Sequence, residues 1–203
     1  MEKIAFIVFE GGEGCGKSTQ AKALSNRLRR LGFPVVLTHE PGGTLLGNRL
    51  RRWVKWGKGV TTQTELFLFL SSRSQLVTGV IRPALEKGSI VICDRFDPST
   101  FAYQGFGRGM DLNFLNTVNS FVTDGLHPDL IVLLDISAEE GLARKKMKLD
   151  VFEREEFLFH QKVREGYLKM AAADPERWMV VDATLPEVKI REMIWERIGQ
   201  LLG

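Results

Sequence analysis

The chain of 203 residues has few cysteines, no long apolar run and no excess of charge of one sign. Its two cysteines, Cys15 and Cys93, do not provide a disulfide framework or a metal-ligand cluster. We expect them to be reduced thiols, as is typical of a cytoplasmic protein. No apolar run approaches the length of a membrane span, and the first residues have neither the apolar core nor the cleavage site of a secretory signal. We therefore expect a cytoplasmic protein with no membrane partner.

The balance of charge excludes another class of partner. The chain has 28 basic and 25 acidic residues, which leaves a net charge of +3. This charge is too small to favour nucleic acid as the main partner. The length suits one sizeable α/β domain or at most two small ones. Because we find no repeat, low-complexity tract or linker, we expect a single domain over residues 1–203.

Short β-branched runs alternate with longer helical patterns along the chain. Continuous apolar runs predict strands that are buried on both faces of a parallel sheet, at Ile4–Phe9, Pro34–Thr38, Ser89–Cys93, Asp129–Leu134 and Trp178–Val181. Helical patterns fall at Lys17–Leu31, Thr62–Glu86, Asp111–Thr123, Ala138–Lys146, Phe152–Ala172 and Glu187–Leu201. We therefore predict a three-layer α/β fold, a five-stranded parallel sheet flanked by helices. Ligands of such folds bind at the carboxyl ends of the strands.

A glycine-rich loop follows the first predicted strand. Gly11-x-x-x-x-Gly16-Lys17-Ser18 matches the phosphate-binding pattern G-x-x-x-x-G-K-[ST] between a strand and a helix. Its backbone N–H groups can point at phosphate oxygens, while Lys17 reaches the β- and γ-phosphates and the Ser18 hydroxyl binds Mg²⁺. The fold is therefore expected to be that of a P-loop NTPase, with ATP as the nucleotide. The residues expected to bind it are Gly11, Gly12, Glu13, Gly14, Cys15, Gly16, Lys17, Ser18 and Thr19.

A phosphate loop alone does not define a reaction, since GTPases and nucleotide-dependent switches also have one. The Asn-Lys-x-Asp sequence with which GTPases recognise guanine is absent. Asp94 and Asp135 each end a predicted strand, so either carboxylate could lie near the metal. Arg95 follows Asp94 and is a candidate ligand for phosphate.

Four segments occur in the order that is typical of one kinase family. They are Phe9-Glu10-Gly11, Glu40-Pro41-Gly42-Gly43-Thr44, Asp94-Arg95-Phe96 and Ser99-Thr100-Phe101-Ala102-Tyr103-Gln104-Gly105. With them the chain resembles the thymidylate kinase family from its first strand to its last helix. The resemblance implies phosphorylation of dTMP to dTDP in dTTP biosynthesis, with ATP as donor and Mg²⁺ as cofactor. It also implies a homodimer, for which the long predicted helix Thr62–Glu86 could supply an interface.

The resemblance assigns residues to the dTMP site. It implies that Glu13 meets the 3′-hydroxyl, that Arg51 holds the acceptor phosphate, and that Phe69 stacks on thymine while Arg73 donates to its O4. Taken alone, Arg51 could belong to a solvated basic face with its neighbours, and Phe69 could be a core residue. The set of substrate-binding residues implied is Glu13, Pro41, Arg51, Phe69, Arg73, Arg95, Tyr103 and Gln104. The family pattern also favours Asp94 over Asp135 for the metal, beside Ser18.

Catalysis in the family needs charge neutralisation by Lys17, Arg95 and one further cation, which comes from the phosphate loop or from a lid over ATP. Gly14 supplies no cation, so we expect a lid near residues 144–155. Arg144 is then implied to bind the nucleotide, with Lys148 or Arg154 catalytic. A basic run of this kind is also an ordinary solvated helix surface.

Overall fold

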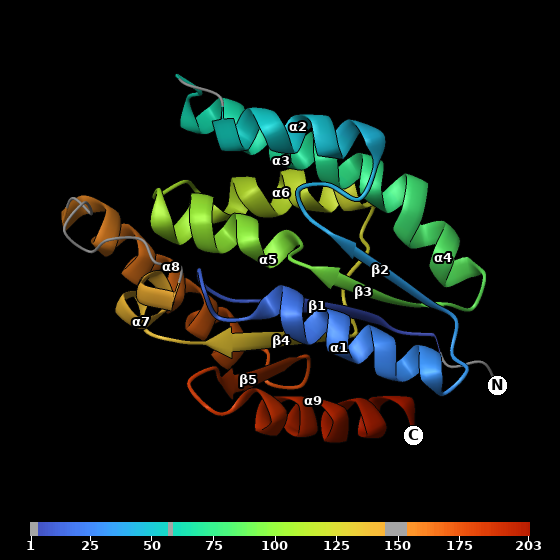
Figure 1. Cartoon of the computed structure of the whole chain (residues 1–203). Coiled ribbons are helices and arrows are strands. Elements are labelled where there is room, and N and C mark those ends of the chain that lie inside the picture. Colours follow the sequence, from blue (N-terminus) through green and yellow to red (C-terminus); the bar gives the residue numbers. More distant parts are fainter. Residues whose placement is uncertain (1–3, 57–58, 145–153) are drawn as a thin grey trace.

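A computed structural model of the chain describes residues 4–56, 59–144 and 154–203. Its strands are β1 (Phe6–Glu10), β2 (Val35–His39), β3 (Ile90–Asp94), β4 (Leu130–Asp135) and β5 (Trp178–Asp182). They form one five-stranded sheet in the order β2-β3-β1-β4-β5, in which every pair is parallel. Figure 1 shows this sheet between two layers of helices, which confirms the predicted three-layer fold.

Helices cover both faces of the sheet in the described part of the chain. They are α1 (Lys17–Arg30), α2 (Leu45–Trp56), α3 (Thr62–Leu76), α4 (Arg82–Glu86), α5 (Asp97–Thr100), α6 (Leu112–Thr123), α7 (Ala138–Arg144), α8 (Arg154–Ala173) and α9 (Glu187–Leu202). Two π-helical segments, η1 (Val77–Ile81) and η2 (Phe101–Gly107), continue α3 and α5. None of the described helices is long and apolar enough to cross a membrane.

The central strand β1 divides the hydrophobic core into two parts, because successive side chains of a strand point to opposite faces. Ile7 and Phe9 pack with buried residues of α1 and α9, such as Leu28 and Ile194. Phe6 and Val8 belong to a second cluster, which includes residues of η1, β3, β4 and α8. Burial on both faces explains why the inner strands β1, β3 and β4 are almost continuous apolar runs.

The helices differ from the predicted ranges at three places, of which the first is α2 (Leu45–Trp56), a helix outside those ranges. The predicted helix Thr62–Glu86 consists of α3, η1 and α4, and the change to π-helix begins at Val77, five residues before Arg82. The segment after Asp94, for which the sequence shows no long helical pattern, is helical through α5 and η2 and begins at Asp97 next to Pro98. Proline is accepted in the first turn of a helix because its missing N–H would have no intrahelical partner.

Candidate active site

The phosphate loop lies at the carboxyl end of β1 and leads into α1. Gly16 caps α1 with a φ of 94°, which an L side chain rarely adopts. Gly14 has a φ of 69°, and a Cβ there would lie 2.0 Å from the carbonyl oxygen of Gly141 in α7. No side chain fits at position 14 without movement of α7, which explains why the loop supplies no further cation besides Lys17.

Lys17 turns back toward the loop that precedes it. Its Nζ donates to the carbonyl oxygens of Gly12, at 2.7 Å, and Gly11, at 3.1 Å. Burial lowers the pKa of this ammonium, and the charge of Arg95 lowers it further. The loop therefore holds Lys17 close to the place where the sequence predicts phosphate.

Ser18 and Asp94 meet at one corner of the site. The Ser18 hydroxyl donates to Asp94 Oδ2 at the end of β3. A hydroxyl and one carboxylate fit Mg²⁺, which commonly takes one or two protein oxygens and completes its shell with phosphate and water. No group of three His, Cys, Asp or Glu side chains clusters as a metal site within the described residues. The competing Asp135 forms a two-fold ion pair with Arg164 of α8, with contacts of 2.7 and 2.8 Å.

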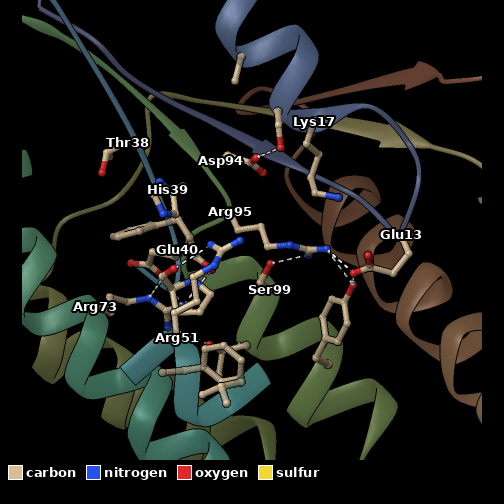
Figure 2. Close-up of a pocket in the computed structure, with 18 of the residues that line it drawn as sticks. Glu13, Lys17, Thr38, His39, Glu40, Arg51, Arg73, Asp94, Arg95 and Ser99 are labelled. Carbon is tan, nitrogen blue, oxygen red and sulfur yellow. Dashed lines mark hydrogen bonds and ion pairs between the residues drawn. The ribbon is translucent and has the colours of Figure 1, made fainter. Parts of the chain in front are cut away.

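Arg95 extends from the end of β3 across the site toward the phosphate loop (Figure 2). Its φ of 73° lies in the left-handed region, which is uncommon for a residue with a side chain and is often found at functional sites. Nη2 lies 3.0 Å from Glu13 Oε1 and 3.1 Å from the Tyr103 hydroxyl. The Tyr103 hydroxyl in turn donates to Glu13 at 3.3 Å, and burial raises its pKa to about 12. Residues from the loop, β3 and η2 thus converge on one point.

One cavity of about 950 Å³ connects these groups. Its walls include Lys17, Ser18 and Asp94 from the phosphate side. The substrate-binding residues that the sequence predicts also line it, namely Glu13, Pro41, Arg51, Phe69, Arg73, Arg95, Tyr103 and Gln104. The structure therefore brings together side chains that are up to 91 positions apart, between Glu13 and Gln104.

In α2 and α3, the residues predicted to bind substrate line the cavity, whereas similar residues next to them do not. Arg51 lines the cavity and donates to the Pro41 carbonyl at 2.9 Å, whereas Arg49 and Arg52 do not line it. Phe69 is half-buried and lines the cavity, while Phe67 is 55% exposed and lies outside it. These positions fit the substrate-binding assignment of Arg51 and Phe69 better than its alternatives.

Arg73 lies at the far end of the cavity from the phosphate loop and is buried. Its Nε donates to Glu40 at 2.8 Å, Nη1 donates to Thr100 at 2.8 Å and to Asn119, and Nη2 donates to the Phe96 carbonyl at 3.0 Å. Burial raises the pKa of Glu40 to about 7, against the opposing charge of Arg73. Nη2 also lies 2.7 Å from Glu40 Oε2, so protein partners face all five N–H groups of the guanidinium, and a bond to thymine would be shared with them.

Gln104 also lines the cavity, and a residue of α3 holds its side chain in place. It is buried, and its Nε2 donates to Glu65 Oε1 of α3 at 2.8 Å. This bond leaves the amide oxygen of Gln104 as the group that can accept from a ligand.

Several site residues have no counterpart in the sequence-based prediction. Glu10, Ser99 and Tyr167 form a hydrogen-bonded group beside Arg95, and Glu40 and Thr100 contact Arg73. Four of these five residues lie in the motifs quoted above, so the motifs could have indicated them as site residues. Tyr167 lies in the middle of α8, where no motif points to it.

The lid residues are placed only in part. Arg144 ends α7, and its Nη1 donates to the Ala183 carbonyl at 2.8 Å. Lys148 lies outside the described residues, and Arg154 is described only as the first residue of α8. Their predicted roles therefore remain predictions.

The fold and the site define a P-loop phosphotransferase whose cavity extends from the phosphate loop to a second, mixed polar and aromatic end. The family model for thymidylate kinase matches residues 9–194. A thymidylate kinase of Dehalococcoides mccartyi strain CBDB1 is 50% identical over 201 residues, which is 98% of this chain and 97% of that protein. The thymidylate kinase of Thermomicrobium roseum is 45% identical over 200 residues, 97% of this chain and 95% of that one.

A solved structure agrees with these relatives. The crystal structure of thymidylate kinase from Ehrlichia chaffeensis has a TM-score of 0.82 and 31% identity, and the match covers 96% of this chain and 98% of that one. The chain described here belongs to the thymidylate kinase family. It is a kinase of the ATP:dTMP phosphotransferase class, so the predicted reaction, with ATP and Mg²⁺, is confirmed at this level.

Proposed function

We propose that the 950 Å³ cavity performs this reaction, with donor phosphates at the phosphate loop and dTMP between Arg95 and Phe69. The observation that carries the assignment is that Glu13 and Lys17 of one loop line the same cavity as Arg95 and Tyr103. A loop that contributes to both nucleotides fixes the distance between donor and acceptor. Such positioning is the main requirement of phosphoryl transfer.

On the donor side, the loop N–H groups and Lys17 bind the phosphates of ATP. Lys17 leaves its contacts with Gly11 and Gly12 for phosphate oxygens, which are stronger acceptors because they are charged. Ser18 and Asp94 would hold Mg²⁺, which neutralises charge on the donor phosphates when bound. Arg144 binds the nucleotide at the lid side.

On the acceptor side, Arg95 and Arg51 bind the phosphate of dTMP, and Glu13 accepts from the 3′-hydroxyl. Tyr103 lies against the sugar and leaves no room for a 2′-hydroxyl, which selects deoxynucleotides. Phe69 stacks on thymine, while Arg73 shares an N–H with O4 and Gln104 contacts the base edge. Pro41 completes the wall of this site.

The acceptor phosphate is the nucleophile and is largely ionised near neutral pH, so no strong general base is required. The work of catalysis is the neutralisation of charge by Lys17 and Arg95. One further cation comes from the lid near residues 144–155, with Lys148 and Arg154 as the candidates. We propose that this lid is part of a single kinase domain spanning residues 1–203.

We further propose a cytoplasmic homodimer. Large apolar side chains are exposed on α3 and α6, with Phe67 55%, Phe114 47% and Phe121 85% exposed. Figure 1 shows α3 and α6 in the same outer layer of the molecule. Light scattering after size exclusion tests the dimer; a monomeric mass at micromolar concentration would contradict it.

Product analysis tests the proposed reaction against a slow nucleotide-dependent switch. With ATP, Mg²⁺ and dTMP, anion-exchange chromatography should show dTDP and ADP in equal amounts. ADP without dTDP would support a hydrolytic switch and contradict the assignment.

A further inference from the structure

Glu10 is the last residue of β1 and is buried, with 0% of its surface exposed. It stands directly before the phosphate loop, but none of the roles assigned above includes it. Its carboxylate accepts from the Phe96 N–H at 2.8 Å, the Ser99 hydroxyl at 2.7 Å and the Tyr167 hydroxyl at 2.7 Å. These donors come from the loop after β3, from α5 and from the middle of α8.

All three partners of Glu10 are donors, which matches a carboxylate that only accepts. Burial raises the pKa of Glu10, and the nearby charge of Arg95 opposes that rise. Because the three groups that face it are all donors, we infer that Glu10 is ionised and is the inner counter-charge of Arg95, while Glu13 is the counter-charge on the cavity side.

The two hydroxyls connect Glu10 with the guanidinium. Arg95 Nη1 lies 3.2 Å from the Ser99 hydroxyl oxygen and 3.3 Å from the Tyr167 hydroxyl oxygen. Because a guanidinium accepts no hydrogen bond, both oxygens present lone pairs to it, and their protons go to Glu10 or to each other. The ionised carboxylate thus sets the direction of both hydroxyls.

Glu10 also acts on the backbone next to Arg95. The bond from Phe96 N–H fixes the peptide that follows Arg95, where φ is 73°. Arg95 N–H itself donates to the Phe9 carbonyl at 2.9 Å. The end of β1 therefore holds the left-handed turn on both sides of Arg95.

We propose that Glu10 is the positioning residue for Arg95, which it aims through the Ser99 and Tyr167 hydroxyls at the place of the transferring phosphate. The inference rests on the proposed role of Arg95. Arg95 exchanges Glu13 for dTMP on the cavity side, while the Glu10 side stays unchanged, so the guanidinium is already oriented when the substrate arrives. A supporting shell of this kind reduces the reorganisation that the reaction would otherwise require.

Tyr167→Phe is the mildest test, because it removes one hydroxyl and keeps the ring in its core cluster. The loss of one hydrogen bond to a charged group can change a rate or binding constant about tenfold. We expect Tyr167→Phe to lower kcat with dTMP about tenfold and to leave the KM for ATP unchanged. Glu10→Gln should lower kcat further, because its amide places a donor against either Phe96 N–H or the hydroxyls.

A double-mutant cycle separates positioning from general structural support. Arg95→Lys keeps the charge but removes Nη1, the atom that meets both hydroxyls. In the Arg95→Lys enzyme, Tyr167→Phe should change kcat less than twofold. Asp129→Asn is the control, since this carboxylate accepts from Phe6 N–H at 2.7 Å at the other end of β1; it should leave kcat unchanged.

These variants also distinguish failure of the positioning role from failure of the proposed function. Equal losses from Tyr167→Phe in both backgrounds would overturn the positioning role and leave the proposed function standing. An Arg95→Ala enzyme with unchanged kcat and unchanged KM for dTMP would overturn both the positioning role of Glu10 and the proposed role of Arg95, because Arg95 would then have no part in the reaction.

Discussion

Arg95 and Glu13 form an ion pair of 3.0 Å between the end of β3 and the phosphate loop. Each is also proposed to bind a different part of dTMP, Arg95 its phosphate and Glu13 its 3′-hydroxyl. The ion pair therefore occupies the acceptor site before the substrate arrives, and binding of dTMP exchanges it for two contacts with the substrate. Because the two side chains hold each other near these positions, little side-chain entropy remains to be lost.

Glu13→Gln tests this exchange. The variant keeps an acceptor oxygen but removes the negative charge that is proposed to face the 3′-hydroxyl and that pairs with Arg95, so the KM for dTMP should rise about tenfold, the value of one charged hydrogen bond. The KM for ATP should change little. Steady-state kinetics with each substrate varied in turn gives both constants. A rise confined to the KM for ATP would place Glu13 on the donor nucleotide instead.

Lys17→Ala removes the charge that the phosphate loop directs at the donor phosphates. Removal of one such electrostatic contact typically lowers kcat by 10² to 10³. Lys189→Ala on α9 is the control, since Lys189 is exposed and does not line the cavity. Full activity of Lys17→Ala in a coupled ADP-release assay would remove the phosphate loop from the mechanism.

Arg73→Ala should lower stability as well as base discrimination. Arg73 and Glu40 are 2.7 Å apart with side chains only 2% and 4% exposed, so the alanine leaves a buried carboxylate without its partner. Loss of one member of a buried pair costs about 3–5 kcal/mol. Arg177→Ala is the matched control: it breaks an ion pair that is 49% exposed on the arginine side, and pairs of this kind are worth about 1 kcal/mol or less. Urea unfolding measures both, and equal losses would contradict the account.

The preference for dTMP over dCMP measures the other part of this prediction. It should fall in Arg73→Ala, because the donor for thymine O4 is gone. An unchanged preference in the folded variant would refute the contact with the base.

Asp97 gives the stability a defined pH dependence. Burial raises its pKa from 3.8 to about 6, and Oδ1 is buried without a hydrogen-bond partner. The folded state therefore binds the proton more tightly than the unfolded state, so this stabilisation is complete below pH 3.8 and is lost as the pH rises through about 6. The whole effect corresponds to up to about 3 kcal/mol. The difference in unfolding free energy between wild type and Asp97→Asn, measured from pH 4.5 to 7, should show this slope; a difference that does not vary with pH would contradict it.

The sheet could be predicted from the sequence because burial on both faces makes the three inner strands β1, β3 and β4 almost continuous apolar runs, while the edge strands β2 and β5 are short apolar runs that are partly exposed. All five predicted strands agree with the structure within two residues. The change from α-helix to π-helix at Val77 could not be predicted, since the two helix types differ in their backbone hydrogen bonds, which the pattern of apolar residues does not show.

The cavity could be predicted in outline because its residues follow strand ends in recognisable motifs. The contacts among these residues could not. The resemblance implies that Arg73 donates to the base, but it does not indicate the contacts of Arg73 with Glu40 after β2 and with Asn119 of α6, which depend on how these segments pack against α3. Glu10 and Tyr167 are 157 positions apart, so only the fold brings them together.

The most direct measurement is an ADP-release assay with a panel of acceptors under identical ATP and Mg²⁺ concentrations. The proposed stacking of Phe69 on thymine, the proposed bond from Arg73 to O4 and the proposed crowding of the sugar by Tyr103 predict the highest kcat/KM with dTMP, and much lower values with dCMP, UMP and AMP. Equal or better values with dCMP, UMP or AMP would contradict the assignment of this cavity to dTMP.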